Sequence, residues 1–212
     1  MKNFFDPQRI WPNGPYPHFL ILLDRYPQYV EYVRQHAELL SRFVHLEAVP
    51  AEWLHITVQG IHHPASPEQL NRLGDEARAE LADVAPFEVQ LGPTWPGVTA
   101  ITVAPYPEEP MATLNRKVRA AVSRVDGVEL RAEEKRFWPH TSIAYAKADS
   151  SQADDYLLNR ALRQLRPERI TLTVDSVHLV QQIQDPKAGY YRWEEVAELP
   201  LGAPGEQKEQ TA

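Results

Sequence analysis

Two pairs of side chains in this 212-residue chain combine a histidine with a hydroxyl group two residues later. The first pair is His55 and Thr57, and the second is His140 and Ser142. Because side chains alternate between the two faces of a β-strand, the members of each pair point the same way if their segments are strands. Histidine can accept or donate a proton near neutral pH, and a hydroxyl group can donate a hydrogen bond to an anionic oxygen. Each pair therefore has the groups for acid–base chemistry on a bound anion.

Both pairs lie in apolar, strand-like segments, Trp53–Ile61 and Phe137–Ala146. If these segments are neighbouring strands, roughly 5 Å apart, two imidazoles and two hydroxyls converge on a space that fits one phosphate. Either pair alone is better explained as a half-exposed strand histidine. The two together favour a reaction site.

Cleavage of a phosphodiester needs a base for the nucleophile, an acid for the leaving oxygen and stabilisation of the phosphoryl oxygens. His55 and His140 have the chemistry for the two proton transfers, and Thr57 and Ser142 can donate to the non-bridging oxygens. This scheme requires no metal. The sequence leaves open which histidine is the base.

From about His18 to Leu201 the sequence resembles the two-histidine (2H) phosphoesterase superfamily, in its LigT-like branch of RNA ligase and cyclic phosphodiesterase proteins. Besides the two histidine pairs, the segment Phe137–Tyr145 is similar to that branch's second motif, including its Phe and Pro before the histidine. The branch often has arginine where this chain has Tyr145. The resemblance implies a metal-independent phosphodiesterase for 2′,3′-cyclic phosphate ends or related 2′-5′ and cyclic nucleotide phosphodiesters.

Two other functions stay open. One is a module that binds RNA ends or nucleotides without turnover, and the other is RNA ligation, the reverse direction of the same chemistry. Metal-dependent hydrolysis ranks lower, because the chain has no cysteine and because His62 and His63 would point to opposite faces of a strand. The expected cofactor set is therefore empty, and no metal ligands are assigned.

Several side chains could contact a substrate at the second motif. Tyr145 and Phe137 could each stack on a base, although packing in the core is the alternative for both. Lys135 and Arg136 offer the best local positive charge, and a solvated strand end is the alternative for them. The other histidines that stand alone are expected to be structural: His18, His36, His45 and His178.

The amino-acid composition restricts which binding partners and which cellular location are expected for the protein. The formal net charge is −7, which argues against a broad footprint for long DNA and leaves a small nucleotide or an RNA 3′ end as the substrate. No apolar run approaches the roughly 20 residues of a membrane helix, so no membrane association is expected. These features predict a cytoplasmic protein, and a monomer is expected.

Apolar periodicity and turn residues divide the chain into a proline-rich arm (1–17), one bilobal domain (18–201) and a disordered tail (202–212). Strands are expected at 18–24, 53–61, 87–91, 98–104, 128–131, 137–146, 170–182 and 190–199. Helices are expected at 27–43, with Val30, Val33, Ala37, Leu40 and Val44 buried, and at 66–84, 110–125 and 149–165. Ser66, Pro67 and Gln69 predict a capping box at the second helix.

This order of elements repeats roughly once along the chain. It predicts an α+β fold of two pseudo-symmetric lobes, each an antiparallel sheet with helices on its outer face. The two motif strands then lie at the centre of a shared cleft. The 2H phosphoesterase fold implied by the resemblance agrees with this arrangement.

Overall fold

The computed structural model of the chain describes residues 1–132 and 136–202. Its strands, in chain order, are β1 (Tyr16–Leu22), β2 (Leu46–Ala48), β3 (His55–Gly60), β4 (Phe87–Pro96), β5 (Ala100–Tyr106), β6 (Thr141–Ala146), β7 (Ile170–Val174), β8 (Ser176–Asp185) and β9 (Tyr190–Pro200). The α-helices are α1 (Pro27–Arg34), α2 (Ala37–Ser41), α3 (Pro67–Leu81), α4 (Glu109–Val122) and α5 (Gln152–Leu165). Two short 3-10 helices are η1 (Pro7–Arg9) and η2 (Ala51–Trp53).

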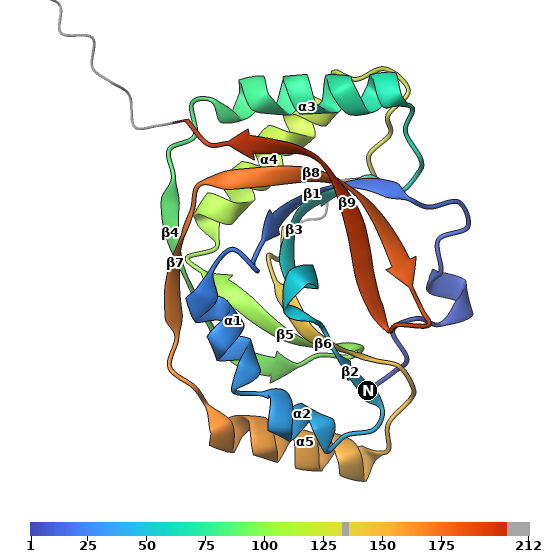
Figure 1. The fold of residues 1–212 in the computed structure, drawn as a ribbon, viewed down its shortest axis with the longest axis vertical. Helices are drawn as coiled ribbons and strands as arrows, with labels where there is room; N and C mark the ends of the chain where they lie inside the picture. Colours follow the sequence, from blue (N-terminus) through green and yellow to red (C-terminus); the bar gives the residue numbers. More distant parts are fainter. Residues whose placement is uncertain (133–135, 203–212) are drawn as a thin grey trace, which may run out of the picture.

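The strands form one curled antiparallel sheet in the order β7-β4-β5-β6-β3-β1-β8-β9, and β2 also pairs with β6. Only one residue pair, Ile56 and Thr141, joins β3 to β6, so the sheet divides there into two lobes. Helices α3 and α4 pack on β9 and β3, whereas α1, α2 and α5 pack on β7, β2 and β4. Figure 1 shows these two helical layers at opposite ends of the molecule, one on each lobe of the curled sheet. The predicted α+β fold with two pseudo-symmetric lobes is confirmed.

The strands of the first lobe separate a helix-covered face from an inner face. On β1, Phe19 and Ile21 belong to the main core, whereas Leu20 and Leu22 belong to a small separate cluster on the inner face. The register pairs Leu22 with His55 and Leu20 with the residue two further along β3. The first histidine motif therefore points to the inner face, away from the helices.

The proline-rich arm packs against the body, as its aromatic residues predict. The ring of Phe4 lies 4.4 Å from that of Tyr145, and the Phe4 N–H donates to the carbonyl of Ala146 at 2.7 Å. Further along, the Trp11 N–H donates to the side-chain oxygen of Gln184 on β8 at 2.7 Å. The arm thus spans from the second motif strand to the last hairpin.

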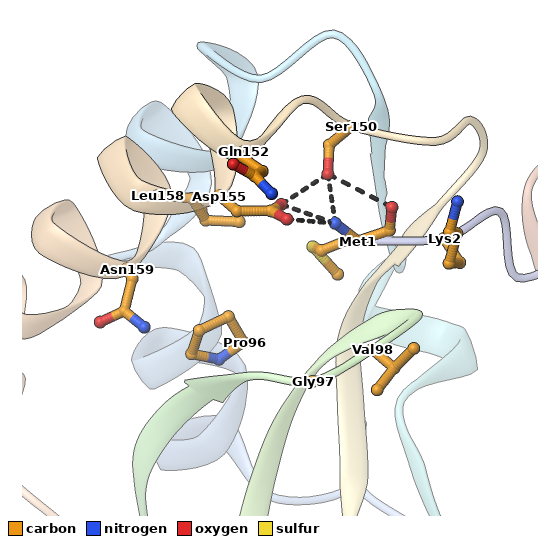
Figure 2. Close-up of a pocket in the computed structure, with 10 residues that line it drawn as sticks. All are labelled: Met1, Lys2, Pro96, Gly97, Val98, Ser150, Gln152, Asp155, Leu158 and Asn159. Carbon is orange, nitrogen blue, oxygen red and sulfur yellow. Dashed lines mark hydrogen bonds and ion pairs between the residues drawn. The ribbon is translucent and has the colours of Figure 1, made fainter.

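A second anchor of the arm is its first residue. The amino group of Met1 forms an ion pair with the Asp155 carboxylate of α5 at 2.6 Å, and it also contacts the Ser150 hydroxyl. Figure 2 shows these groups converging beside Pro96 and Val98 of the β4–β5 hairpin. The anchor fixes the start of the arm to the second lobe.

Several expected elements are confirmed. The capping box at Ser66 forms, with the Ser66 hydroxyl accepting from the Gln69 N–H and the Gln69 side chain accepting from the Ser66 N–H. The long final hairpin also forms between β8 and β9, with Gly189 in the left-handed region at φ 86°. The second motif strand begins one residue later than its histidine, at Thr141.

Three expectations about elements are wrong. The helix expected at 27–43 is two helices, and its buried face is formed by Tyr29, Tyr32 and Leu40, while Val44 is 87% exposed. The aromatic rings bury more apolar surface than valine, and the Tyr32 hydroxyl finds a buried partner in Thr94 at 2.8 Å.

The other two concern strands. Residues 128–131 are not a strand. Residues 170–182 form two strands in different lobes, because the chain leaves β7 after Val174 and re-enters the sheet as β8 at Ser176. The sequence marks this switch only weakly, because no glycine or proline separates the two strands. The predicted tail, apart from Gly202, lies outside the described residues.

Among the described residues, no helix has both the length and the apolar character needed to cross a bilayer.

Candidate functional site

The single residue pair that joins the lobes brings the two histidine motifs together. Antiparallel pairing of Ile56 with Thr141 places His55 across from Ser142, and Thr57 across from His140. Ile56 and Thr141 are buried, with 0% and 1% exposure, so the four motif side chains share the opposite face. All four line one cavity of about 1110 Å³.

The two histidine rings are held in the same way. The Nδ1 of His55 lies 2.9 Å from the carbonyl of Trp53, and the Nδ1 of His140 lies 3.0 Å from the carbonyl of Trp138. In each case Nδ1–H donates to the backbone two residues earlier, so the neutral ring carries its lone pair on Nε2. Gln182 lies 3.3 Å from the Nε2 of His55 and donates to it from its amide nitrogen. Both imidazoles are therefore fixed in the tautomer that acts through Nε2.

Burial keeps both rings neutral at pH 7. The pKa of His55 is lowered to about 4, mainly by burial and to a smaller extent by the nearby His140, against an opposing effect of the Trp53 carbonyl. Burial also lowers the pKa of His140 below its usual value of 6.5. Neither ring holds a proton firmly until an anion binds and raises its pKa.

Aromatic rings flank both histidines. Trp138 stacks on His140 with ring centroids 4.2 Å apart and planes at 19°, yet it is 53% exposed. Trp193 meets the ring of His55 edge-on at 5.0 Å. Trp138 thus presents a large ring at the edge of the cavity.

The two aromatic residues expected to contact substrate occupy different positions. Tyr145 lines the cavity, although only 5% of it is exposed and Phe4 packs on it. Phe137 packs against the core and is not among the cavity residues. The next residue, Trp138, stands at the cavity wall in its place.

The cavity carries positive charge. None of the described residues that line it is Asp or Glu, and two of them are Arg9 and Arg131. The charge predicted at the second motif lies elsewhere, because Arg136 pairs with Glu108 at 2.7 Å and Lys135 is outside the described residues. In a chain of net charge −7, a cavity wall without carboxylates favours anionic ligands.

His18 was expected to be structural, but it lines the same cavity. Its Nδ1 lies 3.2 Å from the carbonyl of Tyr16, which repeats the arrangement of the other two histidines. One sequence signal could have revealed this, because each of the three rings follows an aromatic residue by two positions: Tyr16, Trp53 and Trp138. The arm residues that line the cavity carried no comparable signal.

One group in the described chain has the ligand types of a metal site: His178, Glu195 and Glu198. Arg25 pairs with Glu198 at 2.8 Å and lies 3.6 Å from Glu195. Both carboxylates are therefore already engaged by a protein cation, and Glu195 also bonds His178 at 2.8 Å. The group is not part of the cavity that holds the motif histidines.

The family model of the 2′-5′ RNA ligase superfamily matches residues 28–186, which is well over half of the chain. The chain belongs to this superfamily. The resemblance to LigT-like 2H phosphoesterases is thereby confirmed, and the family consists of phosphoesterase- and ligase-like enzymes. No curated protein matches the chain in sequence.

Solved structures share the fold. TT0787 of Thermus thermophilus is 18% identical and superposes with a TM-score of 0.69, over 90% of this chain and 100% of that one. E. coli LigT complexed with 3′-AMP is 16% identical, with a TM-score of 0.61 over 89% and 99% of the two chains. The PDE domain of MHV ns2 is 10% identical, with a TM-score of 0.53 over 86% and 99%. The two-lobed sheet is thus shared at very low sequence identity.

Proposed function

We propose that this superfamily member is a metal-independent phosphodiesterase that opens 2′,3′-cyclic phosphate ends or related 2′-5′ and cyclic nucleotide phosphodiesters. The observation that carries the proposal is the cross-strand arrangement of His55, Thr57, His140 and Ser142 in a cavity whose described wall has no carboxylate. Two imidazoles and two hydroxyls around one anion-sized space supply every group that the reaction needs.

The substrate phosphate binds over the junction of β3 and β6. Thr57 and Ser142 donate hydrogen bonds to the two non-bridging oxygens, from positions fixed by the sheet. The charge on the phosphate raises the pKa of both rings, so one of them takes up a proton on binding. The site then holds one neutral imidazole and one imidazolium on opposite sides of the phosphorus.

The burial of the two rings assigns their roles. His55 is buried and has a pKa of about 4, so it stays neutral and its Nε2 takes the proton from the attacking water. His140 is less buried, so it holds the proton and passes it to the leaving ribose oxygen. In-line attack opens the ring, and the P–O bond to the leaving oxygen breaks as that oxygen is protonated. In the direction of ligation the two roles exchange.

The ligands of structural relatives support a nucleotide substrate. E. coli LigT has been solved with 3′-AMP, with ATP and with phosphate. In this chain the exposed ring of Trp138 beside His140 suits a nucleobase, since stacking on an aromatic ring tolerates any base.

The test is a substrate panel with the enzyme in EDTA: 2′,3′-cyclic nucleotides, 2′-5′ oligonucleotides, cyclic dinucleotides and an RNA with a cyclic phosphate end, with products identified by mass. We expect His55→Ala and His140→Ala each to reduce kcat/KM by about a hundredfold or more. His63→Ala is the matched control, because this histidine lies outside the cavity and bonds the Glu129 N–H.

Two outcomes count against the proposal. If both histidine variants keep wild-type rates, the motifs do not catalyse the reaction. If nucleotides bind in calorimetry but are never consumed, the chain is a binding module.

A further inference from the structure

The β1 end of the cavity, formed by Trp11, Tyr16, His18, His62 and Arg131, has no role in the mechanism above. It is built from the arm, the first strand and two loops. Three of its five residues precede the segment that matches the family model, which begins at residue 28. The other two, His62 and Arg131, lie within the matched segment, so this end combines matched residues with residues outside the match.

The residues of the β1 end are held in place by several contacts. The indole of Trp11 stacks on Tyr16 and His18 at ring-centroid distances of 4.7 and 5.1 Å. The ring of His18 lies over Gly60, where an added Cβ would approach the Nε2 of His18 to 2.7 Å. Because residue 60 is a glycine, β3 has no side chain there, and the His18 ring occupies that space at the cavity wall.

One ring nitrogen at the β1 end makes no hydrogen bond within the described protein. The Nδ1 of His62 is buried and has no hydrogen-bond partner among the described residues. The His18 and His62 rings meet edge-on with centroids 5.8 Å apart. Buried polar atoms without partners are rare in native proteins, and this one belongs to a ring that lines the cavity.

Arg131 is the positively charged residue of the β1 end. Its carbonyl accepts from the Arg119 side chain at 3.1 Å, so its backbone position is fixed while its own side chain stays exposed. No described carboxylate pairs with it. Arg131 lines the same cavity as His18 and His62. Burial is the main reason that the pKa of His18 is lowered to about 3 and that of His62 to about 4, and the charge of Arg131 contributes to both shifts.

The spacing along β3 relates this end to the reacting phosphate. His18 lies two residues before Leu20, the partner of Thr57, and an irregularity in the pairing takes up the third residue of β3, so the two places are roughly 7 Å apart along the strand. One nucleotide with a phosphate on each side of its sugar can bridge the two places.

We propose that the β1 end is a second anion subsite, which binds the phosphate on the 5′ side of the nucleotide whose cyclic phosphate lies between His55 and His140. The substrate class is then an RNA 3′ end, or a 5′-phosphorylated cyclic nucleotide, and not a nucleoside cyclic phosphate alone. This proposal rests on the proposed function for its orientation.

The experiment compares adenosine 2′,3′-cyclic phosphate carrying a 5′-hydroxyl with the same compound carrying a 5′-phosphate, at equal ionic strength. Wild-type kcat/KM is expected to be about tenfold higher for the 5′-phosphorylated compound, the usual effect of a hydrogen bond to a charged group. Arg131→Gln reduces this ratio to about one. Arg160→Gln removes the same charge from the exposed face of α5 and leaves the ratio at its wild-type value.

A binding measurement separates this inference from the proposed function. Calorimetry compares adenosine 3′,5′-bisphosphate with 3′-AMP, for which no turnover is needed, and the same tenfold preference and the same loss in Arg131→Gln are expected. If neither cyclic compound is hydrolysed but the preference in binding is present, the subsite stands and the enzymatic proposal fails. A ratio near one in the wild-type protein, or a ratio that Arg131→Gln leaves unchanged, overturns the subsite.

Discussion

At the scale of single residues, the two catalytic candidates differ from ordinary histidines mainly in burial. Free imidazole would be half protonated near pH 6.5, but both rings lose their protons at lower pH here because burial disfavours the charged form. The proposed mechanism therefore depends on the bound phosphate to restore one proton. This dependence has a measurable consequence in the pH profile.

The profile of kcat/KM reports the free enzyme. His55 acts as the base above its pKa of about 4, and His140 acts as the acid below a pKa that lies under 6.5. We expect kcat/KM to be highest between these limits and to fall about tenfold per pH unit on the alkaline side. Initial rates at low substrate from pH 4 to 8.5 test this. A profile that rises from pH 6 to 8 would contradict the assignment.

Two adjacent residues of β6 allow a matched comparison. Ser142 faces the cavity and Thr141, 1% exposed, faces the helix-covered side. Ser142→Ala is expected to reduce kcat/KM by about a hundredfold, as for other pre-organised donors, with little change in Tm. Thr141→Ala is expected to leave kcat/KM near wild type and to lower Tm by about 2–4 °C, for roughly 1 kcal/mol of lost packing. Equal effects of the two variants on rate would mean that the hydroxyl of Ser142 has no special role.

At the scale of elements, α3 illustrates a helix that stabilises the fold without touching the site. Its start is fixed by the capping box of Ser66 and Gln69. Ser66→Ala is expected to cost about 1 kcal/mol of unfolding free energy and to lower Tm by about 2–4 °C. Because α3 lies on the outer face, the specific activity of the folded variant is expected to equal that of the wild-type protein. Thermal unfolding and rates at 20 °C check both parts, and a loss of rate without a loss of Tm would speak against them.

The elements that the sequence predicted correctly are those with local signals. The cap at Ser66 and the hairpin turn at Gly189 depend on residues a few positions apart, so they can be recognised without tertiary structure. The break between β7 and β8 at Asp175 has no comparable signal, because no glycine or proline lies between the two strands. The same holds for α1, where Tyr29 and Tyr32 replaced the expected valine stripe through tertiary contacts.

The candidate site divides in a similar way. The pairing of two histidine motifs was readable because residue type and spacing repeat within each strand. The residues of the cavity wall could not be predicted from the sequence, because Trp11 and Arg131 come close to the site only through the path of the arm and of a loop. His18 could be predicted in part. It has an aromatic residue two positions earlier, as the two motif histidines do, but it has no hydroxyl residue two positions later.

At the scale of the whole molecule, the protein contains several histidines buried in the neutral form. Burial lowers the pKa of His18 to about 3 and of His55 and His62 to about 4, and it also lowers that of His36. The unfolded chain takes up protons near pH 6.5 that the folded chain does not bind. The free energy of unfolding therefore decreases as the pH falls from about 6.5 toward 4.

Thermal unfolding at pH 7.5, 6, 5 and 4.5 measures this effect. We expect Tm to fall steadily below pH 6.5, and we expect the fall to be shallower in His18→Gln, which removes one of the neutral rings. Thr141→Ala, which removes no titratable group, serves as the control with an unchanged pH dependence. An equal slope in wild type and His18→Gln would show that other groups cause the acid sensitivity.

The place of β1 between β3 and β8 has a consequence for synthesis. One edge of β1 pairs with β3 soon after both leave the ribosome, but the other waits for β8, about 150 residues later in the chain. At about 5–20 residues per second, that edge is open for roughly 10–30 seconds. Gln182 and Gln184, which bond His55 and the arm, arrive with the same late strand. A nascent chain is therefore expected to acquire a complete reaction centre only when translation of its last hairpin ends.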